Sequence, residues 1–377
     1  MLKRMLRVGI GSAASASMLI AALATGAAHV AAASDGIGAV YVLSNTVTNN
    51  QVLIYQRAVD GTLIANGAAL TGGNGNGGGL GSQGALALSA NNRWLFAVNA
   101  DSNEISSFAV TADGLTLVGK FASGGINPIS LTNYGGLLYV LNAGAPANIT
   151  GFTVNENGWL MPLAGSTQPL STLNPGGAQV SFDPEGVMLA VTEKGTNRID
   201  TYIVNANGIA QAPVVHPSSG TTPFGFAFDN SEHLIVSEAF GGAVNASAAS
   251  SYNVANGNFA VVSASVPTYQ TAACWLVVSK NGRYAYTANA GSGSISGYAI
   301  DANGGLTLLN ANGITALTGA PNSHPSDMSI SRNGQFLFSL NNTAHTITGF
   351  KIGADGSLTS VTLVANLPAS AVGLAAY

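Results

Sequence analysis

Two glutamates interrupt a series of asparagines that recurs along the whole chain. Short apolar segments end in a polar residue at seven places, namely Asn45, Asn99, Asn142, Glu193, Glu238, Asn289 and Asn341. If these ends surround one channel, Glu193 and Glu238 lie in neighbouring repeats and can face each other. Repulsion between the two carboxylates would raise the pKa of one of them and so provide a general acid and a general base. Glu193 and Glu238 are therefore candidate catalytic residues, suited as a pair to opening or closing a lactone ring.

Two other interpretations of the same residues remain open. Oxygen-rich side chains suit Ca²⁺, so the channel can hold this ion, although no pattern in the sequence requires a cofactor or defines a metal. Alternatively the series is structural, in that each Asn caps the loop after its strand and Glu193 pairs with Lys194 or Arg198. Arg198 is also a candidate for binding substrate.

A second set of candidates lies where each repeat enters its first strand. Gln179, Trp275 and Asp327 are candidate substrate-binding residues, because a Trp at a channel mouth can stack on a sugar or lactone ring. His324 is a candidate catalytic residue that can form an acid–base unit with Asp327. The alternatives are a core position for Trp275 and a surface loop for His324, which precedes Pro325.

A repeated four-part unit positions all of these residues. In one example, an apolar strand and turn at 276–283 are followed by strands at 285–289 and 294–300 and by an Asn-Gly turn at 301–305. Asn-Gly and Asp-Gly pairs tolerate the positive φ of tight hairpins. The units recur every 43 to 54 residues, and four meandering strands at such a period are typical of a propeller blade. We predict an all-β, seven-bladed β-propeller with four-stranded antiparallel blades.

The two ends of the repeat array complement each other. The first unit begins directly with residues 39–45, which match the second strand of the other units. The missing first strand corresponds to residues 371–377, AVGLAAY, at the end of the chain. We expect this C-terminal strand to complete blade 1 and to close the ring, which would leave no long unpaired sheet edge.

The N-terminus has the pattern of a signal peptide. Lys3, Arg4 and Arg7 precede an uncharged run at 8–28, and residues 31–33 are alanines. This pattern predicts a signal peptide over residues 1–33 and a single propeller domain over 34–377, with an uncleaved anchor as the alternative. No later segment has the ~20 apolar residues of a spanning helix. We expect an exported monomer, periplasmic or secreted, without a transmembrane span.

Composition narrows the possible partners. Charged residues make up 7% of the chain, against ~25% in ordinary globular proteins. The leader contains three of the twelve basic residues and the others are scattered singly, so we expect no nucleic-acid partner. Cys274 is the only cysteine and excludes an intrachain disulfide. The Gly-rich stretch 72–79 lacks the Lys and helix of a phosphate-binding loop and predicts a flexible connector between blades.

The repeat resembles the seven-bladed lactonase-type propellers, the family of bacterial 6-phosphogluconolactonase and fungal carboxymuconate lactonising enzyme. The resemblance covers residues 39–377 and is carried by phrases such as VSFDPEGVMLAVTEKGTNRIDTYIV and LVVSKNGRYAYTANAGSGSISGYAI. Enzymes of this family often have a His-Pro-His run before the strand that corresponds to VSFDP, and its second His is taken to lie at the active site. In this sequence that position is Ala178, whereas His324-Pro325 provides a similar phrase in blade 7.

The resemblance implies a lactonase-like or carboxymuconate-cyclase-like enzyme that acts on a small lactone or carboxylate in the central channel. A phosphorylated substrate would require clustered Arg or Lys, which the sequence does not provide. The missing His supports a second hypothesis, a non-catalytic propeller that recognises a glycan, a peptide or another cell-envelope partner.

Overall fold

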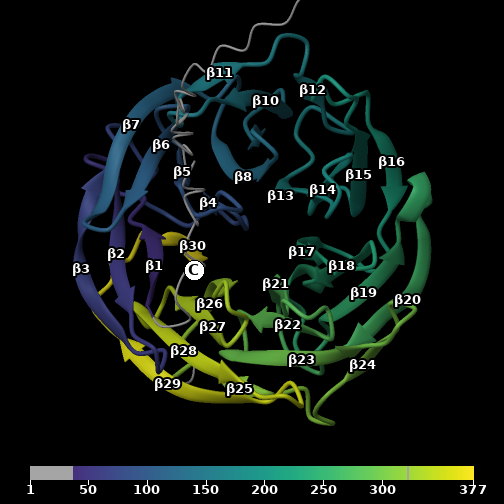
Figure 1. Ribbon diagram of the computed structural model, residues 1–377. Helices are drawn as coiled ribbons and strands as arrows, with labels where there is room; N and C mark the ends of the chain where they lie inside the picture. The colour runs from purple at the N-terminus through teal and green to yellow at the C-terminus, as the bar shows by residue number, and fades with distance from the viewer. Residues whose placement is uncertain (1–36, 321) are drawn as a thin grey trace, which may run out of the picture. The chain divides into compact units, whose positions relative to one another are not determined.

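Seven antiparallel β-sheets form a ring in the computed structural model, which describes residues 37–320 and 322–377 (Figure 1). This confirms the predicted seven-bladed propeller. The expected signal peptide over residues 1–33, and the domain boundary after it, lie outside the described residues. Within the described ranges, no helix is long and apolar enough to cross a membrane.

Each blade runs from an inner strand at the channel to an outer strand at the rim. Blade 1 consists of β30 (Val372–Ala376), β1 (Gly38–Leu43), β2 (Gln51–Arg57) and β3 (Leu63–Leu70). Blade 2 consists of β4 (Leu86–Leu88), β5 (Trp94–Asn99), β6 (Glu104–Thr111) and β7 (Gly114–Ala122). Blade 4 consists of β13 (Gly177–Phe182), β14 (Met188–Glu193), β15 (Arg198–Ile203) and β16 (Val214–Pro217). Blade 5 consists of β17 (Pro223–Phe228), β18 (His233–Glu238), β19 (Ala248–Asn253) and β20 (Ala260–Pro267). Blade 7 consists of β26 (Pro325–Ile330), β27 (Phe336–Asn341), β28 (Thr346–Ile352) and β29 (Leu358–Val364).

The outer strand is divided into two short pieces in blades 3 and 6. Blade 3 consists of β8 (Pro128–Tyr134), β9 (Leu137–Asn142), β10 (Asn148–Val154), β11 (Leu160–Pro162) and β12 (Gln168–Pro169). Blade 6 consists of β21 (Ala273–Val278), β22 (Tyr284–Asn289), β23 (Ser294–Ile300), β24 (Leu306–Leu308) and β25 (Ala316–Leu317). Two single-turn 3₁₀ helices lie at Phe240–Gly242 and Ala255–Gly257.

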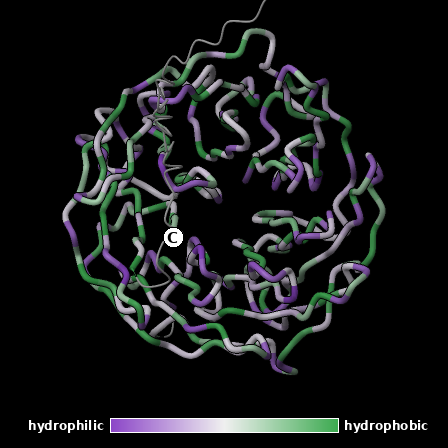
Figure 2. The backbone as a smooth tube through the Cα atoms, viewed as in Figure 1, coloured by the Kyte–Doolittle hydropathy of each residue, from purple (hydrophilic) through white to green (hydrophobic). Residues whose placement is uncertain are grey.

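Burial decreases from the inner to the outer strands. Every residue of β14, β18, β22 and β27 is buried, because these second strands lie inside their blades. In contrast, β3 is mostly exposed along its length. Apolar clusters join neighbouring blades, as where Trp275 and Tyr286 of blade 6 pack with Met328 of blade 7. The hydrophobic segments are accordingly distributed around the whole ring (Figure 2).

The C-terminal strand closes the ring, as predicted. β30 pairs with β1 in antiparallel register, for example Val42 with Leu374. Arg57 Nε donates a hydrogen bond to the Tyr377 carbonyl oxygen at 3.2 Å, which holds the chain end against β2. The Leu374 N–H donates to Asp327 Oδ2 at 3.0 Å, which joins the same strand to blade 7.

A chain that ends at Ser370 should be strongly destabilised, because it lacks β30 and exposes the edge of β1. The buried side chains of Val372 and Leu374 alone contribute about 3–6 kcal/mol to the free energy of unfolding. Urea denaturation measures the loss, and a chain that lacks only Tyr377 is the control. Equal stability of the two truncated chains would contradict closure by β30.

Candidate functional site

A pocket of ≈ 410 Å³ lies between the inner strands of the ring. Its walls come from β13, β17, β21 and β26, and Pro184 and Lys280 at the turns after two of these strands are exposed to solvent. The polar side chains of the lining are Gln83, Gln179, Ser181, Asp183, Lys280, Asp327 and Ser329. The pocket therefore opens on the face of the ring that carries the turns between first and second strands.

The chain that enters blade 2 reaches across the channel to blades 4 and 6. Gln83 Nε2 donates to the Leu276 carbonyl oxygen at 2.8 Å, and the Leu276 N–H donates to Gln83 Oε1 at 3.0 Å. The Gln83 N–H donates to the carbonyl oxygen of Ala178 at 3.1 Å. Because Leu276 belongs to blade 6 and Ala178 to blade 4, this residue spans the centre of the ring.

Three further side-chain hydrogen bonds hold the crossing segment, residues 80–84. Trp275 Nε1 donates to the Ser82 carbonyl oxygen at 2.8 Å, and Ser82 Oγ donates to that of Ile129 at 2.8 Å. Lys194 Nζ donates to the Gly81 carbonyl oxygen. The indole of Trp275, which is 6% exposed, thus supports the crossing segment and does not line the pocket.

Asp327 is a buried carboxyl group in the wall of the pocket. Its Oδ1 accepts the Met328 N–H at 2.7 Å, its Oδ2 accepts the Leu374 N–H, and the residue is 1% exposed. Burial raises the pKa of Asp327 to about 8, so the group is mostly protonated at neutral pH. The carboxyl group of Asp327 is thus held in the pocket wall by two backbone N–H groups.

Gln179 also lies in the pocket wall, but its amide is bound between two blades. Its Nε2 donates to the Phe226 carbonyl oxygen at 2.9 Å, and the Phe226 N–H donates to its Oε1 at 2.8 Å. The side chain therefore joins blade 4 to blade 5, and a ligand meets it as a wall whose hydrogen bonds are already made.

Glu193 interacts with Asp200 and with the connection from blade 3. The Ser171 N–H donates to Glu193 Oε1 at 2.9 Å and to Asp200 Oδ2 at 3.0 Å, while Ser171 Oγ and Thr196 Oγ1 donate to Glu193 Oε2. Burial, reinforced by Glu193, raises the pKa of Asp200 to about 8. No ion pair joins Glu193 to Lys194 or Arg198 in the described part of the chain.

Glu238 has an equivalent role in blade 5. It accepts hydrogen bonds from the Gly220 N–H at 2.8 Å, from Ser250 Oγ, and from Ser265 Oγ at 2.7 Å. Burial raises its pKa. Neither Glu193 nor Glu238 lines the central pocket, and no contact between them is found among the described residues.

Four of the seven anchor residues, Asn142, Glu193, Glu238 and Asn341, bind the connection that comes from the preceding blade. Asn142 Nδ2 donates to the Ser123 carbonyl oxygen, and Asn341 Nδ2 donates to that of Thr318, both at 3.2 Å. Ser123 and Thr318 precede the blades whose second strands end in these asparagines. The sequence interpretation placed the cap on the loop after the strand, whereas these bonds lie on the connection that enters the blade.

The remaining candidates lie apart from the pocket. Arg198 begins β15 and is exposed, and His324 is exposed before β26 with a φ of 55°. No hydrogen bond joins His324 to Asp327 among the described contacts, and only Asp327 lines the pocket. The described residues contain no group of three or more His, Cys, Asp or Glu that could hold a metal. Ca²⁺ in the channel stays a prediction without a ligand set.

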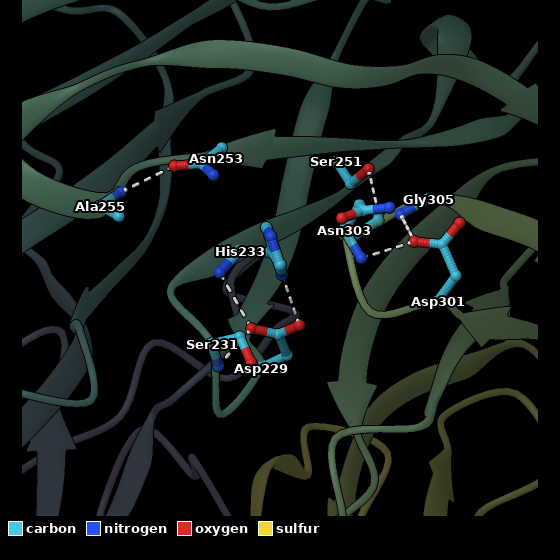
Figure 3. Close-up of polar contacts among 10 residues, drawn as sticks. Asp229, Ser231, His233, Ser251, Asn253, Ala255, Asp301, Asn303 and Gly305 are labelled. Carbon is cyan, nitrogen blue, oxygen red and sulfur yellow. Dashed lines mark hydrogen bonds and ion pairs between the residues drawn. The ribbon is translucent and has the colours of Figure 1, made fainter.

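A buried His–Asp pair lies at the boundary of blades 5 and 6 (Figure 3). His233 Nδ1 and Asp229 Oδ2 are 2.8 Å apart, and Asp229 Oδ1 accepts the N–H groups of Ser231 and His233. A Cβ at Gly304 would lie 2.5 Å from the imidazole, so the ring packs closely on the turn after β23. Sequence analysis missed this pair, although the spacing of four residues across a turn was a usable signal.

Comparisons with known proteins agree on one architecture. The family model described as lactonase, 7-bladed beta-propeller, matches residues 80–371. A proposed 6-phosphogluconolactonase from Bacteroides fragilis is 20% identical, with a TM-score of 0.69 over 90% of this chain and 98% of its own. The periplasmic gluconolactonase of Pseudomonas aeruginosa is 17% identical, with a TM-score of 0.69 over 90% and 98%. No curated protein sequence matches the chain.

Asp200→Asn should flatten the pH dependence of stability. A carboxyl group whose pKa is raised in the folded state stabilises the fold in its protonated form, and this contribution is lost as the pH rises from about 4 towards about 8. Urea denaturation at pH 5 and pH 8.5 should therefore show a smaller fall in the free energy of unfolding for Asp200→Asn than for wild type. The exposed Asp113→Asn is the control, and an unchanged fall in Asp200→Asn would contradict the assignment.

His233→Ala should lower the free energy of unfolding by about 1–3 kcal/mol, because it leaves Asp229 Oδ2 buried without a partner. His233→Asn should lose less, since its Nδ2 can replace Nδ1 as a donor. Thermal and urea denaturation measure both variants. Equal losses would show that packing on Gly304, and not the hydrogen bond, accounts for the role of His233.

Proposed function

Because this chain belongs to the lactonase family of seven-bladed β-propellers, we propose that it binds a small lactone in the central pocket and hydrolyses it. The observation that carries the proposal is Asp327, a buried carboxyl group with a pKa of about 8 in the pocket wall. Perturbed carboxyl groups in a concave site are typical of catalytic acids.

The proposed reaction uses the two carboxyl groups of the lining. Water adds to the lactone carbonyl carbon and loses a proton to Asp183, the ring C–O bond breaks, and Asp327 protonates the leaving oxygen to give the hydroxy acid. Asp183 is fixed for this role, since its Oδ1 accepts the N–H groups of Val187 and Met188 at 2.9 and 3.1 Å. Burial raises the pKa of Asp183 above its usual value and that of Asp327 to about 8. We assign the base to Asp183 and the acid to the more deeply buried Asp327.

The charges of the pocket favour an uncharged or singly charged ligand. Lys280 is the only cationic side chain of the lining, whereas a phosphate group is usually held by several Arg or Lys side chains. We infer an unphosphorylated sugar lactone or acyl lactone as substrate. Export to the periplasm or medium, which we also propose, is consistent with such a substrate.

The contacts of Ala178 favour the interpretation that the reaction takes place at the open end of the channel. In the family resemblance, this position corresponds to a His at the active site. Here Ala178 is fully buried, and its carbonyl oxygen accepts the Gln83 N–H of the crossing segment. The end of the channel that the family His would serve is occupied by the chain itself, so the proposed chemistry uses different residues.

A second candidate function is ligand binding without catalysis. The observation that favours this function concerns three of the predicted site residues, Gln179, Glu193 and Glu238. Their polar side-chain atoms form hydrogen bonds between or within blades. In that case the same pocket retains a small polar ligand, such as a glycan end, and releases it unchanged.

Asp327→Asn should lower kcat/KM for lactone hydrolysis by about 10²-fold or more, because the leaving oxygen loses its proton donor. Acid release from a panel of unphosphorylated sugar, aromatic and acyl lactones measures the rate, with Asp113→Asn as the control. For wild type the rate should fall as the pH rises through about 8, where Asp327 loses its proton. Ligand binding measured by calorimetry without acid release would instead support the non-catalytic candidate. The absence of both ligand binding and acid release would reject both candidate functions.

A further inference from the structure

The connection between blades 1 and 2 is the longest of the ring. Fifteen residues separate β3 from β4, whereas five to seven separate the outer strand of every other blade from the next inner strand. The inner strand that follows, β4, has only three residues. The extra length is therefore used before blade 2 begins, and Figure 1 shows the chain near β4 reaching towards the centre of the ring.

Both halves of this connection are held by specific contacts. In the Gly-rich half, Asn45 Nδ2 donates to Asn76 Oδ1 at 2.8 Å, and the Gly77 N–H donates to the Asn45 carbonyl oxygen at 2.9 Å. In the half that crosses the channel, the contacts of Gln83 with blades 4 and 6 are supplemented by blade 5. A Cβ at Gly225 would lie 2.1 Å from Gln83 Oε1, so only glycine leaves room for the clamp.

We propose that residues 80–84, here called the stopper, block one end of the channel and so set the depth of the pocket. Gln83 is the residue of the stopper that determines which ligands fit. This rests on the proposed function, in that the ligand occupies the central pocket. The stopper restricts the pocket to a small ring compound that enters from the face with the Asp183 turn. Without the stopper, the channel would continue past Ala178 and Trp275 and admit a ligand with a longer substituent.

Gln83 is the central residue of the stopper because its side-chain amide bonds to the backbone of Leu276 as a neighbouring strand would. One side chain supplies both the donor for the Leu276 carbonyl oxygen and the acceptor for the Leu276 N–H. Gln179 makes the same pair of bonds with Phe226, but between adjacent blades. Gln179→Ala therefore removes an equal number of hydrogen bonds without opening the end of the channel, and it is the matched control for the rate of alkylation in Gln83→Ala.

Alkylation of Cys274 tests whether the stopper closes the channel. Cys274 adjoins Trp275 and is the only cysteine, and burial raises the pKa of its thiol to about 12, so it should react slowly in wild type. In Gln83→Ala the reaction with a maleimide should be about tenfold faster, and in Gln179→Ala it should stay within about twofold of wild type. Trp275→Phe loses the bond to Ser82 and is the second variant. Its reaction with maleimide should also be faster than that of wild type, so it can replace Gln83→Ala if that variant does not fold.

Ligand size tests whether the stopper sets specificity. A series of lactones with increasing acyl length should show a length cut-off for binding in wild type, and Gln83→Ala should bind the longer members. Equal alkylation rates in all four proteins, or an unchanged cut-off in Gln83→Ala, would overturn the proposal. If wild type binds no lactone of the series, the proposed function fails, whereas the alkylation rates still decide whether residues 80–84 close the channel.

Discussion

The pairing of β30 with β1 is the contact on which the rest of the structure depends. It joins residues from the two ends of the described chain, and Arg57 and Asp327 then fix the same strand from blades 1 and 7. The inner strands surround a pocket only when this contact is made. Asp327 therefore combines two roles. The carboxyl group that would donate a proton to a ligand also accepts a hydrogen bond from the Leu374 N–H of β30.

Buried polar side chains at the ends of the second strands meet a second requirement of the ring. Each blade must receive a connection from the blade before it, and the buried N–H and carbonyl groups of that connection need partners. Asn can donate and accept, as Asn341 does in donating to the Thr318 carbonyl oxygen and accepting from Ser339 Oγ. A carboxylate only accepts, and Glu193 and Glu238 are accordingly surrounded by N–H groups and by the hydroxyl groups of Ser and Thr. The two exceptions in the asparagine series thus reflect different donors in the connections.

The candidate site was predicted in part, for a reason that lies in the order of the strands. Gln179 and Asp327 belong to first strands, which line the channel, and both are found in the pocket wall. Glu193 and Glu238 end second strands, which lie between the first and third strands and so do not reach the channel. The repeat shows which residues are equivalent, but it does not show which side of a strand faces the channel. The predicted Glu193–Glu238 pair is replaced in the structure by the contact of Glu193 with Asp200.

The sequence by itself determined the number of blades, the four-strand unit and the closing strand. These features follow from local alternation and turn residues, and a repeat reveals which strand is missing at one end and present at the other. Only the tertiary structure decided that residues 80–84 cross the channel, that Trp275 supports them, and that the pocket opens on one face. Gln83 and Leu276 are 193 residues apart, and a contact between two distant segments leaves no periodic trace in either of them.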